Sequence, residues 1–294
     1  MSIFIRIYNR FFRELYWVLN MPYLLRFKKI SALKNVIVYF VKNNQKFSDK
    51  HIPLTSTICR SKSKKLIIHL PYGGLGDHLL YSHIPRLAKT SGEYSEVLIS
   101  NKSLIRNKTH LDYIWKRNPY VDGFTDEENL HNYNDPKIAT FDINDGNILD
   151  QIMLSYGIDD GIRWHDPELF FKVPIFPELQ GKNVYDPNFI SYSGSLSSQK
   201  INNFFVTHNY KIDFQFKVRS SLALPVINFD NFIMDSSFED FCGILVSCDK
   251  LFTLTTGTAT LAAALRRPTT VFSGKEMPKY FQHSKCHTYV SSPK

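Results

Sequence analysis

The sequence has few cysteines and lacks both a long apolar run and a low-complexity tract. Its four cysteines, Cys59, Cys242, Cys248 and Cys286, form no Cys-x-x-Cys pair. This spacing favours a reducing cytosol and argues against a disulfide framework or a metal site. Nowhere do about 18 apolar residues follow one another, so no simple membrane-spanning helix is expected. With 294 residues, 43% hydrophobic and 21% charged, the chain is typical of a globular protein of one or two domains with a short appendage.

The net charge of +9 is located almost entirely in an N-terminal arm. Residues 1–50 contain ten Lys/Arg and two Asp/Glu, whereas residues 51–294 contain 26 and 25. The globular body is therefore nearly neutral, which argues against a nucleic-acid partner.

Within this arm, residues 3–19 predict an amphipathic helix. Arg6, Arg10 and Arg13 recur at helical spacing and form one polar stripe on an otherwise apolar and aromatic surface. Such a helix suits the headgroup region of an anionic membrane, with the basic residues up to Lys46 above the lipid phosphates. The alternative is a helix whose apolar face packs on the body. The membrane interpretation predicts a peripheral protein on the cytoplasmic face of a bacterial inner membrane, and no signal peptide is expected.

From Ser61 onward, apolar runs alternate with helical patterns, which predicts an α/β fold with parallel strands. A strand at 65–70, a glycine-rich loop at 71–76 and a helix at 77–89 with Asp77 at its N-cap open the series. A strand at 95–100, a helix near 109–117 and a strand at 138–143 follow. The proline-spaced segment 159–189 is interpreted as a link between two halves.

The second half repeats this rhythm in a shorter form. We expect a strand at 188–192, a polar loop at 193–200, a helix at 237–248, a strand at 251–255, a helix after Thr256 that Pro268 ends, and a strand at 269–272. The predicted organisation is an arm (1–60), an N-terminal lobe (61–180) and a C-terminal lobe (181–294).

Two loop-to-helix junctions contain residues that suit ligand binding or catalysis. Around Gly257, the backbone N–H groups of a helix start and the flanking hydroxyls suit a phosphate. The loop Ser193–Ser198 with Lys200 adds hydroxyl donors and a cation. The predicted nucleotide-sugar contacts are Ser193, Ser195, Thr255, Thr256, Gly257 and Thr258. The alternative is that the glycine forms only a tight turn and the threonines only caps.

The first junction differs because Asp77 follows its glycines, Gly73, Gly74 and Gly76. A carboxylate at a helix start repels phosphate, so this loop suits presenting a general base to a substrate, with His78 beside it on the acceptor side. The alternatives are a plain N-cap for Asp77 and a packing role for His78.

These residues resemble glycosyltransferase family 9, the ADP-heptose:lipopolysaccharide heptosyltransferases. The likeness rests on Gly73-Gly-Leu-Gly-Asp77 with the helix after it, on Asn118-Pro-Tyr-Val-Asp-Gly123, and on the stretch from Phe238 through Thr255-Thr-Gly-Thr-Ala-Thr-Leu-Ala-Ala-Ala-Leu265 to Gly274. It covers about residues 63–125 and 188–274. Thr255 stands where the family usually has Asp, and Thr260 where it usually has His.

The resemblance implies a GT-B enzyme, with two Rossmann-like lobes facing each other across a cleft. It implies that Asp77 is the general base, that Lys200 contacts the donor diphosphate, and that no metal or other cofactor is required. The expected reaction is an inverting transfer of heptose or hexose from a nucleotide diphosphate sugar to a lipopolysaccharide, lipooligosaccharide or capsule acceptor. Because of the two threonine departures, a non-catalytic relative that holds a glycolipid acceptor or partner at the membrane is the alternative.

Overall fold

The computed structural model describes residues 65–128, 146–189, 195–275 and 281–291. Residues Lys64–Lys294 form one compact unit. The arm at 1–60, the strand expected at 138–143 and Ser193 lie outside the described residues, so these expectations and the proposed domain limits stay predictions. No helix in the described ranges is long and apolar enough to cross a membrane.

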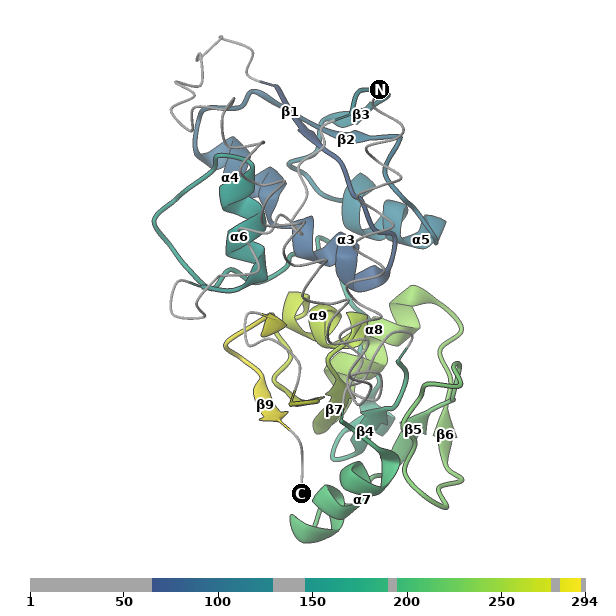
Figure 1. The fold of residues 1–294 in the computed structure, drawn as a ribbon. Coiled ribbons are helices and arrows are strands. Elements are labelled where there is room, and N and C mark those ends of the chain that lie inside the picture. The colour runs from purple at the N-terminus through teal and green to yellow at the C-terminus, as the bar shows by residue number, and fades with distance from the viewer. Residues whose placement is uncertain (1–64, 129–145, 190–194, 276–280, 292–294) are drawn as a thin grey trace, which may run out of the picture. The chain divides into compact units, whose positions relative to one another are not determined.

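The first lobe is built on a parallel sheet with the described strand order β1-β2-β3 (Figure 1). β1 spans Lys65–Ile68, β2 spans Glu96–Ser100 and β3 spans Gly123–Thr125. Leu66 pairs with Val97 and Ile68 with Ile99. The short β3 was not expected from the sequence, because a single phenylalanine between Gly123 and Thr125 gives no periodic signal.

The helices of this lobe are α3 (Leu75–Tyr81), α4 (Ile84–Thr90), α5 (Lys108–His110), the π-helical turn η2 (Leu111–Lys116) and α6 (Ile148–Ser155). The single helix expected at 77–89 is therefore wrong: it is two helices. Pro85 lacks an N–H and its ring crowds the preceding turn, so α3 ends at Tyr81 and a new helix begins with the proline in its first turn.

The second lobe contains a six-stranded parallel sheet with the order β6-β5-β4-β7-β8-β9. Its strands are β4 (Asn183–Asp186), β5 (Phe214–Phe216), β6 (Phe232–Ile233), β7 (Lys250–Leu254), β8 (Thr269–Ser273) and β9 (Thr288–Ser291). Of the strand expected at 188–192, residues 190–192 lie outside the described residues; Asn188 and Phe189 are in no strand, and the first strand of this sheet ends at Asp186, before Pro187. Apolar residues on both sides of Pro187 made the position ambiguous.

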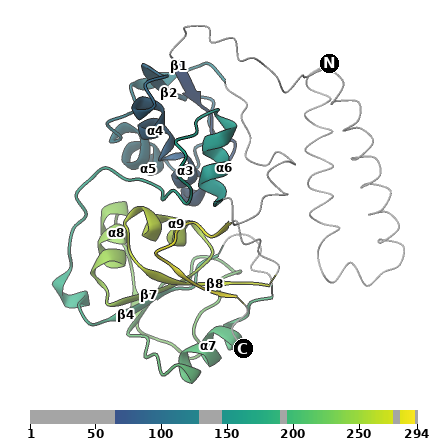
Figure 2. The same cartoon turned by 90° about the vertical axis from the view of Figure 1, so that its left-hand side faces the viewer.

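Three longer helices complete this lobe, and a hydroxyl residue caps each one. The helices are α7 (Ser198–Thr207), α8 (Phe238–Ser247) and α9 (Gly257–Ala264), with Ser197, Ser237 and Thr256 at their N-caps. The 3₁₀ turn η5 (Pro177–Leu179) lies in the link before β4. The helices α8 and α9 match the sequence expectation, since N-cap residues followed by apolar periodicity are strong signals. Figure 2 shows α8 and α9 above the sheet, with α7 beneath it.

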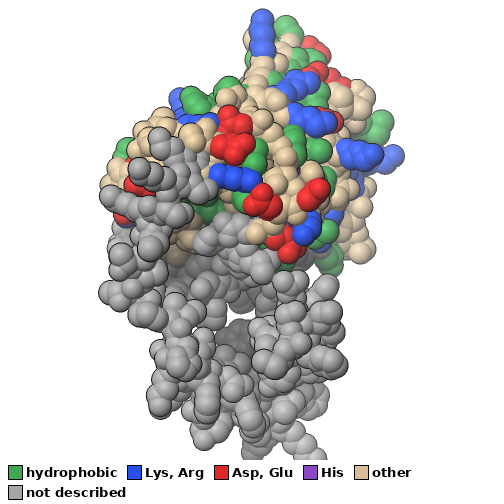
Figure 3. Space-filling model, turned by 90° about the horizontal axis from the view of Figure 1, so that it is seen from above, with side chains coloured by type: hydrophobic (Ala, Val, Ile, Leu, Met, Phe, Trp, Pro, Cys, Tyr) green, Lys and Arg blue, Asp and Glu red, His purple; other side chains and the backbone are tan. Residues whose placement is uncertain are grey.

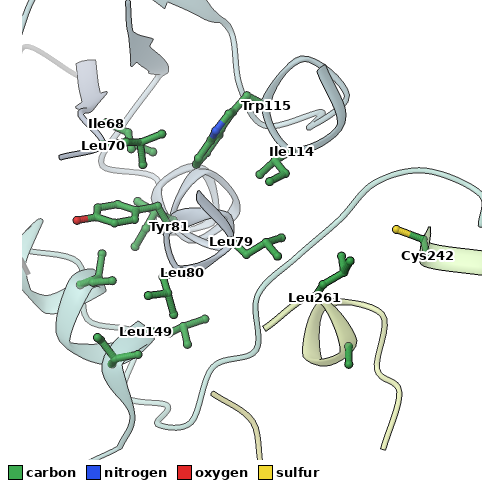
Figure 4. Packing of buried hydrophobic residues seen from close by; sticks show 14 of the residues in the cluster. Ile68, Leu70, Leu79, Leu80, Tyr81, Ile114, Trp115, Leu149, Cys242 and Leu261 are labelled. Carbon is green, nitrogen blue, oxygen red and sulfur yellow. The ribbon is translucent and has the colours of Figure 1, made fainter. Parts of the chain in front are cut away.

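The main hydrophobic cluster joins helices from both lobes. Leu79 and Leu80 on α3, Leu149 on α6, Cys242 on α8 and Leu261 on α9 belong to it and are almost completely buried. Figure 4 shows Leu80 beside Leu149 of α6, and Leu79 on the side of α3 toward Leu261 of α9. This packing places the start of α3 close to the start of α9.

Candidate active site

The second sheet has a topological switch point between β4 and β7. From β4 the chain adds β5 and β6 on one side, whereas β7, β8 and β9 extend the other side. Ligands of open parallel sheets bind outside the carboxyl ends of the strands at such a point. Here the carboxyl end of β4 is Asp186, and Thr255 directly follows β7. The sheet topology therefore places a candidate ligand site at the residues predicted for the nucleotide sugar.

The threonines after β7 form a compact hydrogen-bonded helix start. Thr256 caps α9, and its hydroxyl oxygen accepts the backbone N–H of Thr258 at 3.2 Å. The hydroxyl of Thr255 donates to the carbonyl oxygen of Phe272 at 3.2 Å, and that of Thr258 donates to the carboxylate of Asp186 at 2.6 Å. Gly257 is the first residue of α9, so its backbone N–H belongs to a helix start, where an anion is favoured.

Asp186 is a residue that the sequence analysis missed. The residue is 3% exposed, and Oδ1 accepts the backbone N–H of Asn188 at 3.0 Å and its side-chain amide N–H at 2.8 Å. Burial raises the pKa of this carboxyl, against the lowering effect of the hydrogen bonds from Thr258 and Asn188. An acidic residue at the end of a short apolar run, directly before a proline, was the signal available in the sequence.

Lys200 and Ser195 lie together at the start of α7. The Lys200 ammonium donates to the carbonyl oxygen of Ser195 at 3.0 Å, and the Ser195 hydroxyl accepts the backbone N–H of Lys275 at 3.3 Å. Lys275 comes soon after β8, the neighbour of β7, so this group belongs to the same carboxyl edge of the sheet. The structure thus links two of the predicted donor contacts to that edge.

The glycine loop of the first lobe holds Asp77 in the first turn of α3. The N-cap is Gly74 and not Asp77 as expected; Asp77 Oδ2 accepts the Gly74 backbone N–H at 2.9 Å. A carboxylate three residues after the N-cap can reach back to the backbone N–H of the cap residue, which explains the difference. Asp77 is partly exposed, so a substrate hydroxyl can approach it.

The two glycine loops lie directly against each other. A Cβ atom added at Gly76 would lie 3.1 Å from the Cα of Gly257, and one added at Gly257 would lie 3.0 Å from the backbone nitrogen of Gly76. Only glycines permit so close an approach of two backbones. Because Asp77 follows Gly76, the proposed base lies next to the start of α9.

Gly73 has a different neighbour. A Cβ atom added there would lie 2.7 Å from the carbonyl oxygen of Leu104. The loop after β2 therefore packs against the glycine loop at Gly73.

His78 does not reach the surface of this site. Its side chain is fully buried, its Nδ1 accepts the indole N–H of Trp115 at 2.9 Å, and its Nε2 lies 3.2 Å from the carbonyl oxygen of Leu104. Burial lowers the pKa of His78 to about 4, so the imidazole is neutral with its proton on Nε2. The structure thus places His78 in the core, as the packing alternative had it, rather than against an acceptor.

A buried polar network lies beside the site. Asp150, at the start of α6, accepts the backbone N–H groups of Asn147 and Trp164, both at 2.7 Å, and contacts the ring of His165 at 2.6 Å. Burial would raise the pKa of Asp150, but these hydrogen bonds hold it below its usual value. The segment that begins at Trp164, within the link expected at 159–189, is therefore anchored to α6.

On α9, the Thr260 hydroxyl lies 2.8 Å from Nδ1 of His283. An imidazole 23 residues further along the chain thus reaches the side chain of Thr260 on α9.

The described residues show no group of three or more metal-binding side chains. On the face seen in Figure 3, basic and acidic side chains are interspersed, without a stripe of one sign.

No protein-family model matches the sequence, and no curated protein is significantly similar to it. Solved structures do match. A family 9 glycosyl transferase from Veillonella parvula superposes with a TM-score of 0.53 at 10% identity, over 77% of this chain and 85% of that one. The heptosyltransferase TibC in complex with ADP-D-beta-D-heptose superposes with a TM-score of 0.55 at 12% identity, over 77% of this chain and 62% of TibC.

A second structure of TibC, an iron-containing dodecameric glycosyltransferase from enterotoxigenic E. coli, gives a TM-score of 0.53 at 14% identity. This chain spans less than two thirds of the length of TibC. The expected α/β architecture with parallel sheets is confirmed, and the chain shares its fold with these glycosyltransferases.

Proposed function

We propose that this chain is a glycosyltransferase that moves a sugar from a nucleoside diphosphate donor to a hydroxyl of a lipopolysaccharide, lipooligosaccharide or capsule acceptor. The observation that carries the proposal is the contact between the Asp77 loop and the start of α9, where Gly76 and Gly257 touch. A base and an anion-binding helix start are thereby neighbours. The shared fold with family 9 structures supports the same assignment.

The donor binds at the switch point of the second sheet in this proposal. Its diphosphate lies at the start of α9, near Gly257 and Thr258, with Lys200 as the mobile cation of the same edge. Backbone N–H groups and an ammonium stabilise the negative charge that develops on the leaving diphosphate. Heptose carried by an adenosine diphosphate is the first donor to test, because TibC was solved with that compound.

Asp77 is the general base of the proposed transfer. Its carboxylate removes the proton from the acceptor hydroxyl as that oxygen bonds to the anomeric carbon. The bond from this carbon to the diphosphate oxygen breaks, and its electron pair leaves with the nucleoside diphosphate. Attack opposite the leaving group inverts the anomeric configuration. The steps use only side chains, backbone N–H groups and the two substrates.

The location is part of the proposal. The arm at residues 1–46 holds the protein against an anionic membrane, on the cytoplasmic face of a bacterial inner membrane where a glycolipid acceptor is available. Flotation of the full chain with anionic liposomes tests this. We expect binding that weakens as salt rises and when Arg6, Arg10 and Arg13 are changed to Gln; equal flotation of both proteins at all salt concentrations argues against it.

A specific observation favours a second function. Thr255 stands where glycosyltransferase family 9 usually has Asp, and its hydroxyl donates to the carbonyl oxygen of Phe272. A non-catalytic relative that holds a glycolipid acceptor would tolerate this change.

Incubation with ADP-heptose, UDP-hexoses and GDP-hexoses, with and without lipopolysaccharide or capsule fragments, separates the two functions. A transferase releases nucleoside diphosphate only when its donor and acceptor are both present. Binding of an acceptor without release from any donor supports the non-catalytic function instead.

A further inference from the structure

Asp186 is a buried carboxyl to which the proposed transfer assigns no role. It ends β4 at the switch point, and burial of the charged form has to be offset by its partners. Those partners are the hydroxyl of Thr258, at 2.6 Å from Oδ2, and the two N–H groups of Asn188 on Oδ1. The carboxyl is therefore directly hydrogen-bonded to the second residue of α9, within the proposed donor site.

This contact removes one hydrogen-bond donor from the proposed donor site. A threonine hydroxyl has one proton to donate. In Thr258 that proton points to Asp186, while the backbone N–H of the same residue is engaged by Thr256 Oγ1. As long as Asp186 is ionised, the Thr258 hydroxyl can only accept, so it cannot donate to a phosphate oxygen. Once Asp186 is protonated, the acid can donate to Thr258 and leave that hydroxyl free to donate to an anion.

We propose that Asp186 is a positioning residue that couples donor binding to the uptake of one proton through the hydroxyl of Thr258. The proposal rests on the proposed function, because it takes the donor diphosphate to lie at the start of α9. Proton and diphosphate then favour each other: the neutral acid releases a donor hydroxyl and removes a negative charge next to the phosphates.

The surroundings of Asp186 fit a site that takes up a proton. Burial already raises the pKa of its carboxyl, and an approaching anion acts in the same direction. The charged group that opposes this is Arg219, which follows β5 and is itself paired with Asp235 after β6. The neighbouring Tyr185 is fully buried, and its phenol hydroxyl donates to the carbonyl oxygen of Leu224 at 2.7 Å, so it adds no charge.

Isothermal titration calorimetry of the full chain tests the coupling. The probes are ADP-heptose, UDP-glucose and GDP-mannose without acceptor, whose diphosphates have no proton to gain near neutral pH. Titrations at several pH values, each in two buffers of different ionisation enthalpy, measure proton uptake. For the probe that binds, we expect an uptake that approaches about one proton per bound donor. The affinity should fall by up to about tenfold for each unit by which the pH rises.

Substitutions separate the hydroxyl from the charge. In Asp186→Asn we expect no proton uptake, a flat pH profile and binding at least as tight as that of the natural protein at high pH. Thr258→Val weakens binding and also loses the pH dependence, whereas Thr258→Ser retains both. Asp249→Asn changes an exposed carboxyl at the opposite, amino end of β7 and leaves uptake unchanged.

The outcomes are distinguishable. Binding with no proton uptake, or with equal uptake in Asp186→Asn, overturns the inference and leaves the proposed function standing. No binding of any of the three probes overturns the proposed function and the inference together. Thermal unfolding of each variant shows whether it is folded.

Discussion

The contact between the two glycine loops can be tested by filling it. Gly257→Ala places a methyl group 3.0 Å from the backbone nitrogen of Gly76 and 3.3 Å from the Cβ of Leu75. Gly76→Ala places one 3.1 Å from the Cα of Gly257 and 3.4 Å from the hydroxyl oxygen of Thr260. The nearest neighbour in each case is a backbone atom, which cannot rotate away, so the helix starts have to separate by a few tenths of an ångström.

Two opposing effects set the size of the change. Alanine in place of glycine favours a helix by up to about 1 kcal/mol. Overfilling a close-packed contact costs typically about 1–3 kcal/mol. We therefore expect each single substitution to lower the free energy of unfolding by about 1 kcal/mol, as the difference of the two terms. Because the first methyl group already separates the loops, the second should cost less, and the double variant should be non-additive by about 1 kcal/mol.

Urea unfolding of the four proteins measures these energies. Gly123→Ala is a matched control, since its new Cβ would meet only the Cδ2 of Leu98, at 3.7 Å. Stabilities of Gly76→Ala and Gly257→Ala that equal or exceed the control, together with strict additivity in the double variant, would refute the reasoning that these loops touch.

Three further predictions concern the surroundings of the site. Burial lowers the pKa values of His83 and His283 to about 3, so between about pH 6.5 and that value only the unfolded chain gains their protons. As the pH falls through this range, the free energy of unfolding should decrease by at most about 1.4 kcal/mol per pH unit for each histidine. Urea unfolding from pH 7 to 4 measures this slope, and His283→Gln should reduce it. Asp150→Asn replaces a carboxylate oxygen that accepts backbone N–H groups by an amide, and it should lower the free energy of unfolding by about 3–5 kcal/mol. A decrease below about 1 kcal/mol in urea unfolding would contradict the buried network. Arg117→Ala removes a half-exposed pair with Glu239, at 3.2 Å, and should change stability by less than about 1 kcal/mol in the same assay, with a larger loss pointing to a role in holding η2 on α8.

Local signals in the sequence identified the elements that carry the proposed chemistry. Ser237 and Thr256 mark helix starts with side-chain caps; the residues after them form α8 and α9, and the apolar run before Thr256 forms β7. The glycine loop before the first helix was also identified, although its last two expected residues, Leu75 and Gly76, already belong to α3. These features depend on neighbours in the chain, which a sequence displays directly.

Features that depend on distant partners were missed. The hydrogen bond from Thr258 to Asp186 joins residues 72 positions apart, and the approach of His283 to Thr260 joins residues 23 apart. The burial of His78 likewise depends on Trp115, which is far away in the sequence. Apolar residues on both sides of Pro187 hid the correct end of β4. Only the tertiary fold brings such groups together, so residue spacing cannot reveal them.

The most direct test of the proposed transfer is Asp77→Asn. The amide oxygen can still accept the Gly74 N–H, so α3 should keep its start, while the side chain can no longer take a proton. With the donor and acceptor found in the release assay, we expect turnover to fall about 100- to 10,000-fold and donor affinity to stay within about twofold. Turnover equal to that of the natural protein would contradict the assignment of Asp77 as the base.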